Sequence, residues 1–187
     1  FLKEHVNTYE TKVFGILVIT NLVGLIFEFL CIMTIHTLGV EHIITTLINK
    51  LFLVVIAAFV SLWSIYAFYI TLIENKEQKQ KLFMIGKIVY FILFVITAIL
   101  AMILPIDIYN KNSIMYSYGL GPNVIFTYSA ICGVVGTLLI LISKKLGKNK
   151  KLIPLLIYII GGIVILFVQK NNPALTLSTT MQTFFVF

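Results

Sequence analysis

The chain has 187 residues, of which 60% are hydrophobic and only 11% are charged, and its formal net charge is +7. A soluble domain is about half apolar and about a quarter charged, because its surface must be polar, so this composition excludes a soluble globular protein. The lysines that carry the charge stand in short segments beside long apolar runs, which favours membrane orientation over nucleic-acid binding. We therefore predict an integral membrane protein whose main partner is the lipid bilayer.

The apolar runs divide the chain into predicted membrane helices. A hydrocarbon layer about 30 Å thick needs roughly 20 helical residues, and backbone groups in lipid must bond within their own segment. The sequence therefore predicts an all-α polytopic bundle, one membrane-embedded domain over residues 1–187 without a β-sheet. Its six predicted spans are 13–37, 51–73, 82–106, 124–143, 152–168 and 174–187. Because the sixth span is still running at the last residue, we expect this chain to be a fragment of a longer protein.

The distribution of lysines predicts how these helices are oriented. The N-terminal stretch 1–12 and the two loops on the same side of the predicted bundle carry ten lysines, whereas the loops on the other side carry three. The ten are Lys3, Lys12, Lys76, Lys79, Lys81, Lys144, Lys145, Lys148, Lys150 and Lys151, and the three are Lys50, Lys111 and Lys170. Cytoplasmic loops are enriched in lysine, so residues 1–12 and the C-terminal end are predicted to be cytoplasmic. Lys87, inside the third span, can extend its long side chain towards the lysine-rich side.

Glu28 is the one carboxylate inside the first apolar run. At 1.5 Å per residue it lies about 22 Å above Val13, in the predicted outer half of the membrane. Asn21, Gly24 and Glu28 share one helix face, which we expect to turn towards another helix, because an ionised group facing lipid is costly. Three roles remain open: an inter-helix hydrogen bond or a pair with Lys50, the sensing of a ligand, ion or proton, or simple solvation near the outer headgroups.

The segment 112–129 is predicted to form a turn on the outer side, because Gly119, Gly121 and Pro122 favour turns. Three tyrosines and the amide of Asn123 accompany it: Tyr116, Tyr118 and Tyr128 are the tyrosines. Such rings form aromatic belts at headgroup depth, but with the amide they would also suit a shallow pocket open to the outside or to lipid. A second outer loop, 168–175, adds Gln169 to the candidate signal-sensing residues.

No motif of soluble chemistry occurs in the chain. Neither G-x-x-x-x-G-K-[ST] nor H-E-x-x-H is present, and isolated histidines such as His42 are expected to be solvated in loops. Cys31 and Cys132 stand in apolar runs and are expected to pack as small core residues. We therefore expect no catalytic site, metal or cofactor in this segment. Gly133 with Gly136, and the pair Gly161–Gly162, are predicted to be points of close helix contact.

Three stretches carry a resemblance to a known family. They are "TYETKVFGILVITNLVGLIFE", "MYSYGLGPNVIFTY" and "KLIPLLIYIIGGIVILFVQKNNPALTLSTT", in this order. Together they resemble the multi-spanning N-terminal sensor region of bacterial sensor histidine kinases, mostly from Firmicutes. The resemblance covers nearly the whole chain, although it consists of a helix pattern and a few polar positions. Similar sensors precede diguanylate cyclase domains of the GGDEF type.

This resemblance implies a location in the bacterial plasma membrane, a seventh helix before Phe1 and a cytoplasmic output module after the sixth span. It also implies a homodimer formed through that module, and a response regulator as partner, with no nucleic acid. No phospho-acceptor histidine is present in this segment, so the kinase assignment rests on analogy. Two alternatives stay open: the sensor of a diguanylate cyclase, and a small transporter or substrate-binding membrane subunit.

Overall fold

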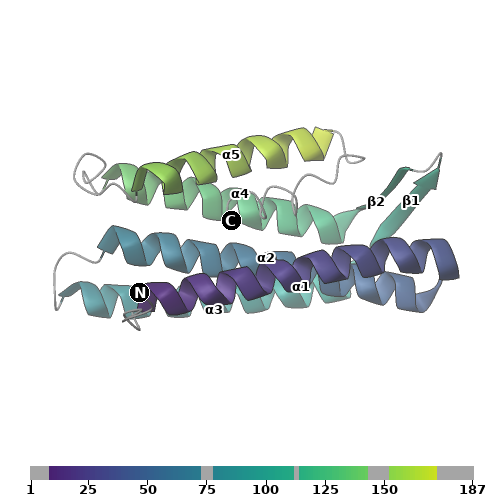
Figure 1. Cartoon of the computed structure of the whole chain (residues 1–187), viewed down its shortest axis with the longest axis horizontal. Coiled ribbons are helices and arrows are strands. Elements are labelled where there is room, and N and C mark those ends of the chain that lie inside the picture. The colour runs from purple at the N-terminus through teal and green to yellow at the C-terminus, as the bar shows by residue number, and fades with distance from the viewer. Residues whose placement is uncertain (1–8, 73–77, 112–113, 143–151, 172–187) are drawn as a thin grey trace, which may run out of the picture.

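The computed structural model describes residues 9–72, 78–111, 114–142 and 152–171, and the structural statements below concern these residues. The described elements are α1 (Tyr9–Leu38), α2 (Ile43–Leu72), α3 (Gln78–Ile103), β1 (Asp107–Lys111), β2 (Ile114–Tyr118), α4 (Leu120–Ile142) and α5 (Leu152–Asn171). The helices lie side by side as an elongated bundle (Figure 1). Helix α2 is central, because it packs against α1, α3 and α4, while α5 packs mainly against α4.

Four of the described helices are long and apolar enough to cross a membrane: Thr11–Leu38, Ile43–Leu72, Gln80–Ile103 and Leu120–Ile142. The predicted helical membrane bundle is confirmed to this extent. The fifth predicted span lies in α5, whose apolar part, Leu155–Ile165, is shorter than these four. The sixth predicted span, 174–187, lies outside the described residues, so a count of six spans is not confirmed.

Helix α2 begins eight residues earlier than the predicted span at residue 51. Gly39 adopts a positive φ of 87° and its N–H donates to the carbonyl of Ile35, which ends α1. His42 then begins α2, because its imidazole Nδ1 accepts a hydrogen bond from the N–H of Ile44 (3.2 Å). His42 is exposed, as expected, and it also caps the helix. The polar residues that follow His42 were predicted to lie in a loop, but they belong to the buried side of α2.

The prediction that the chain has no β-sheet is wrong. Strands β1 and β2 form an antiparallel hairpin in which Asp107 pairs with Tyr118 and Tyr109 with Tyr116. Pro105 follows the end of α3, as a residue that cannot continue a helix, and its carbonyl accepts a hydrogen bond from Gly121 at the start of α4. The hairpin projects from the end of the bundle (Figure 1). An open two-stranded sheet is compatible with a membrane protein there, because the rule that excludes sheet edges applies within hydrocarbon.

Glycines determine how closely neighbouring helices approach. A Cβ built on Gly133 would lie 2.9 Å from Ile163 of α5, and one on Gly136 would lie 3.2 Å from Ile159. The predicted close contacts at Gly133 and Gly136 are therefore confirmed. The close contact predicted at Gly162 is wrong, because nothing lies within 4 Å of a Cβ built there. A Cβ on Gly86 of α3 would collide with the ring of Phe68 of α2. These contacts form where a missing side chain lets a bulky one fill the space.

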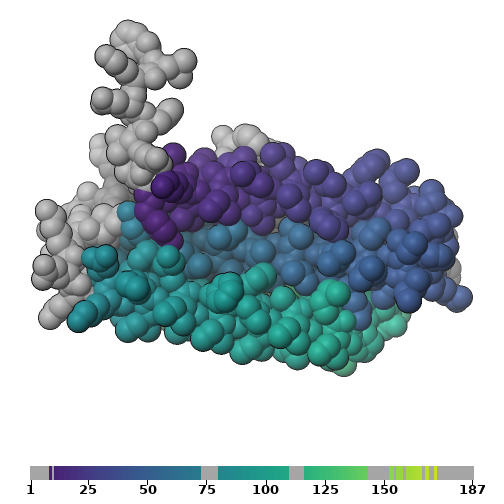
Figure 2. All heavy atoms as spheres, turned by 90° about the horizontal axis from the view of Figure 1, so that it is seen from below, coloured from purple at the N-terminus to yellow at the C-terminus, as the bar shows by residue number. Residues whose placement is uncertain are grey.

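The outward surface of the bundle is apolar. Ile19, Phe29 and Phe91 are each more than 60% exposed, and many other large aliphatic side chains of α1, α3 and α4 are exposed with them. Figure 2 shows α1, α2 and α3 side by side along one such face. Exposed apolar surface of this extent marks a membrane or partner contact in a folded protein.

Candidate functional site

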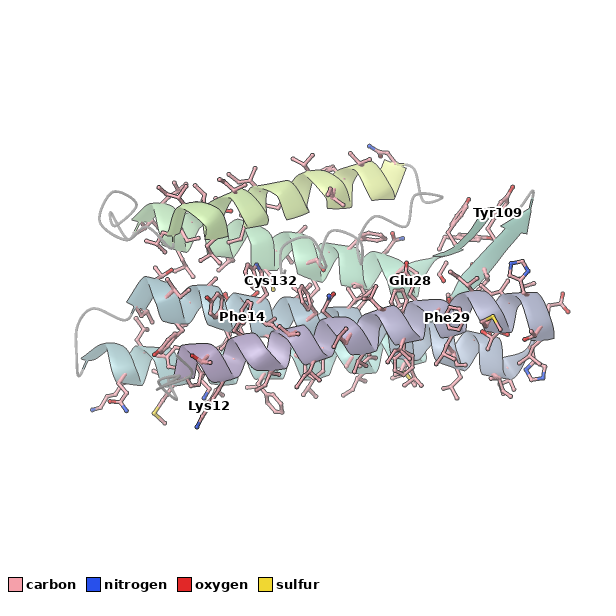
Figure 3. The ribbon with its side chains drawn as sticks, viewed as in Figure 1. Lys12, Phe14, Glu28, Phe29, Tyr109 and Cys132 are labelled. Atoms are coloured by element: carbon pink, nitrogen blue, oxygen red, sulfur yellow. The ribbon has the colours of Figure 1, made fainter. Side chains whose placement is uncertain are left out.

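The predicted polar face of α1 turns towards α2. Asn21 is completely buried, and Gly24 is buried with the position of a Cβ 3.8 Å from Val55 of α2. Glu28 is partly buried, next to Phe29, whose ring is exposed (Figure 3). The ammonium of Lys50, considered as a partner of Glu28, donates a hydrogen bond to the main-chain oxygen of Met102 (2.7 Å). Lys50 therefore binds the C-terminal end of α3, where the helix dipole favours a cation.

Tyr128 lies in the core and not in an aromatic belt. It is 7% exposed, and its hydroxyl is 2.6 Å from Ser61 Oγ of α2. Because Ser61 donates its own proton to the carbonyl of Ala57 (2.7 Å), the tyrosine hydroxyl is the donor in this pair. Helix α4 begins at Leu120, which places Tyr128 about 12 Å along the helix from its start. The earlier helix start is the reason the prediction for Tyr128 was wrong.

A polar chain joins the hairpin to the bundle. Ser117 of β2 donates to Asn49 Oδ1 of α2 (2.8 Å), and the Asn49 amide donates to the carbonyl of Thr45 (2.8 Å). The Thr45 hydroxyl in turn donates to the carbonyl of Gly39 between α1 and α2 (2.8 Å). Asn49 and Thr45 are buried. Sequence reasoning missed all three side chains, because only the fold brings position 117 beside position 49.

The tyrosine face consists of Tyr109, Tyr116 and Tyr118, on the side of the hairpin opposite to Ser117. Residues alternate between the faces of a strand, so the bond from Ser117 turns its own face towards α2 and the tyrosines away from it. The rings of Tyr109 and Tyr116 stack with centroids 5.0 Å apart, and Tyr116 and Tyr118 are 6.1 Å apart. Tyr118 is 48% exposed. Tyr109 was not predicted as a site residue, although its alternation with Ile108 is typical of a strand.

The remaining predicted site residues lie elsewhere. Asn123 is exposed in the first turn of α4, where its N–H donates to Gly119 and its carbonyl accepts from Thr127. Gln169 lies in the last turn of α5, and its side chain is outside the described part. The structure thus brings Tyr116 and Tyr118 together, whereas Asn21 is buried within α1 and Glu28 is partly buried further along the same helix.

The opposite end of the bundle holds an aromatic cluster, formed by Tyr9, Tyr69 and Phe83 with Lys87. The three ring centroids are 4.7 to 5.4 Å apart, and they come from α1, α2 and α3. The Lys87 ammonium lies 5.3 Å from the Tyr9 centroid and 5.7 Å from that of Phe83, within cation–π range. Burial, with a smaller contribution from Tyr69, raises the pKa of Tyr9 above its usual value. Lys87 reaches back over Phe83 towards the start of α3.

Among the described residues, no three His, Cys, Asp or Glu side chains gather as a group that could hold a metal ion. Comparison of the chain with protein-family models, with curated proteins and with solved structures finds no match. A functional interpretation therefore depends on the two ends of the bundle, the polar chain and the sequence pattern.

Proposed function

We propose that this chain is the membrane signal-sensing region of a bacterial two-component sensor histidine kinase. The proposal includes six spans in this segment, a plasma-membrane location, and an outer side that holds the hairpin. It follows from the lysine distribution and from the resemblance of the sequence to such sensors. The observation that carries it is the polar chain Ser117–Asn49–Thr45, because this chain connects an exposed hairpin to the junction of two long apolar helices.

The mechanism follows from that connection. A signal that binds the tyrosine face, or a membrane property that alters its environment, would favour one of two arrangements of the hairpin relative to α2. Such a signal shifts the equilibrium only by the difference between its affinities for the two arrangements. Displacements of about 1–2 Å between packed helices are sufficient in known switches. The last span would pass this change to a dimeric cytoplasmic kinase, which phosphorylates a response regulator.

The test measures response-regulator phosphorylation by the full-length protein in bacterial membranes. Ser117→Ala removes the first donor of the polar chain and should reduce the response to the signal at an unchanged membrane level. Thr127→Ala is the matched control, because its exposed hydroxyl bonds only within α4 at the same end of the bundle. Tyr116→Ala and Tyr118→Ala should act like Ser117→Ala.

A normal response in the Ser117, Tyr116, Tyr118 and Asn123 alanine variants would show that neither the hairpin nor the start of α4 is the input. Formation of cyclic diguanylate in place of phosphotransfer would assign the output to a diguanylate cyclase.

A further inference from the structure

Asp107 is an exposed carboxylate at the base of the hairpin. It forms no hydrogen bond or ion pair with any side chain in the part of the chain that the structure describes. The position of a Cβ on Gly119 would lie 3.4 Å from its Oδ2, so the carboxylate sits beside the first turn of α4. The carboxylate is therefore open to solvent beside the start of α4.

The partner of Asp107 across the hairpin is a tyrosine. Asp107 pairs directly with Tyr118, and residues that are opposite in an antiparallel ladder share one face with Cβ atoms about 5 Å apart. Asp107 is thus the fourth member of the face that carries Tyr109, Tyr116 and Tyr118. The half-exposed ring of Tyr118 and the carboxylate can contact one ligand group together.

An aromatic ring beside a carboxylate recognises an organic cation. The negative π face attracts an ammonium group within about 6 Å, and methylated ammonium groups are bound well because they lose little hydration. The end of the face near Asp107 therefore favours a cation.

We propose that Asp107 and the tyrosine face form a binding site for a small organic cation that carries a methylated ammonium group. The proposal deepens the proposed function, since it names the ligand class of the same hairpin. The cation packs its methyl groups on Tyr118, with Tyr116 and Tyr109 extending the aromatic surface for an attached apolar group. The carboxylate of Asp107 supplies the counter-charge.

The test titrates choline into the purified chain in maltoside micelles, with binding measured by saturation-transfer NMR of the N-methyl protons. The control ligand is 3,3-dimethylbutan-1-ol, which has the shape of choline without its charge. Choline should bind about fivefold more tightly than the neutral alcohol. Asp107→Asn and Tyr118→Leu should each weaken choline binding about fivefold, whereas Tyr118→Phe, which keeps the ring, should preserve it.

Glu41→Gln is the matched charge control, because Glu41 is an exposed carboxylate at the same end of the bundle. It should leave choline binding unchanged. Hydrogen exchange of the β1 and β2 amides shows whether each variant keeps the hairpin. Equal binding of the neutral alcohol, or unchanged choline binding in folded Asp107→Asn, would identify an apolar belt and overturn the proposal. The measurement requires no kinase output, so its failure is distinguishable from failure of the sensor function.

Discussion

The two ends of the bundle use the same aromatic chemistry in different ways. In the aromatic cluster, three rings from three helices surround a cation supplied by the chain, Lys87. On the tyrosine face, three rings stand on one hairpin beside the carboxylate of Asp107. The cluster joins three helices around a cation of the chain itself, whereas the face exposes the ring of Tyr118. The difference indicates a structural role for the cluster and is the basis of the recognition role that we propose for the face.

The first prediction is that the two ends of the bundle lie on opposite sides of the membrane. Asn112→Cys, between the two strands, should be labelled by an impermeant thiol reagent in intact cells. Asn149→Cys, in the lysine-rich loop, should be labelled only after permeabilisation. The expected effect is all-or-none, because the reagent does not cross the bilayer. The reverse pattern would invert the orientation and place the aromatic cluster outside.

The second prediction tests whether the aromatic cluster is structural. Phe68 lies with its ring 6.2 Å from that of Phe83, and a Cβ at Gly86 would collide with Phe68. Gly86→Ala should therefore disturb the cluster and lower the free energy of unfolding by about 1–3 kcal/mol, the range for overpacked cores. Thermal unfolding in detergent measures this effect. Gly162→Ala is the control, since nothing lies within 4 Å of its added methyl group, and equal stability of the two variants would contradict this role.

The third prediction concerns Glu28, between the two ends. Glu28→Gln keeps the shape and a hydrogen-bonding oxygen, so a structural role should cost about 1 kcal/mol or less, the range for inter-helix bonds in membranes. Glu28→Leu removes both and should reduce the folded yield and the output. Folded yield and output activity of both variants are compared at equal membrane levels. A well-folded Gln variant with locked output would instead assign the charge a sensing role, and a harmless Leu variant would exclude both roles.

The smallest effect is expected from removing the cluster's own cation. Lys87→Met keeps most of the chain length but removes the ammonium over Tyr9 and Phe83. The loss should be about 0.5–1 kcal/mol of stability, the size of a partly exposed cation–π contact. Chemical unfolding monitored by the fluorescence of Trp63 would detect it. Lys81→Met, with an exposed side chain at the same end of α3, is the control, and equal stability of both variants would show that the cation is dispensable.

The sequence alone was sufficient for the helical membrane class, because the length of an apolar run and the thickness of hydrocarbon predict a span without knowledge of its neighbours. It also predicted the contacts at Gly133 and Gly136 and the inward face of Asn21 and Gly24, since helical spacing places those residues on one side. The start of α2 could not be predicted, because Thr45 and Asn49 resemble loop residues until their buried partners are known.

Only the tertiary structure decided which polar groups meet. The pairs Ser61 with Tyr128 and Asn49 with Ser117 join positions 67 and 68 residues apart, and no local pattern encodes them. The hairpin was missed for a related reason. The rule that forbids open sheets holds only inside lipid, and the sequence did not show where α3 ends and such a sheet becomes possible. Hydrophobic burial acts on each segment separately, so it can be read from sequence, whereas hydrogen bonds between distant segments require the packed bundle that positions both partners.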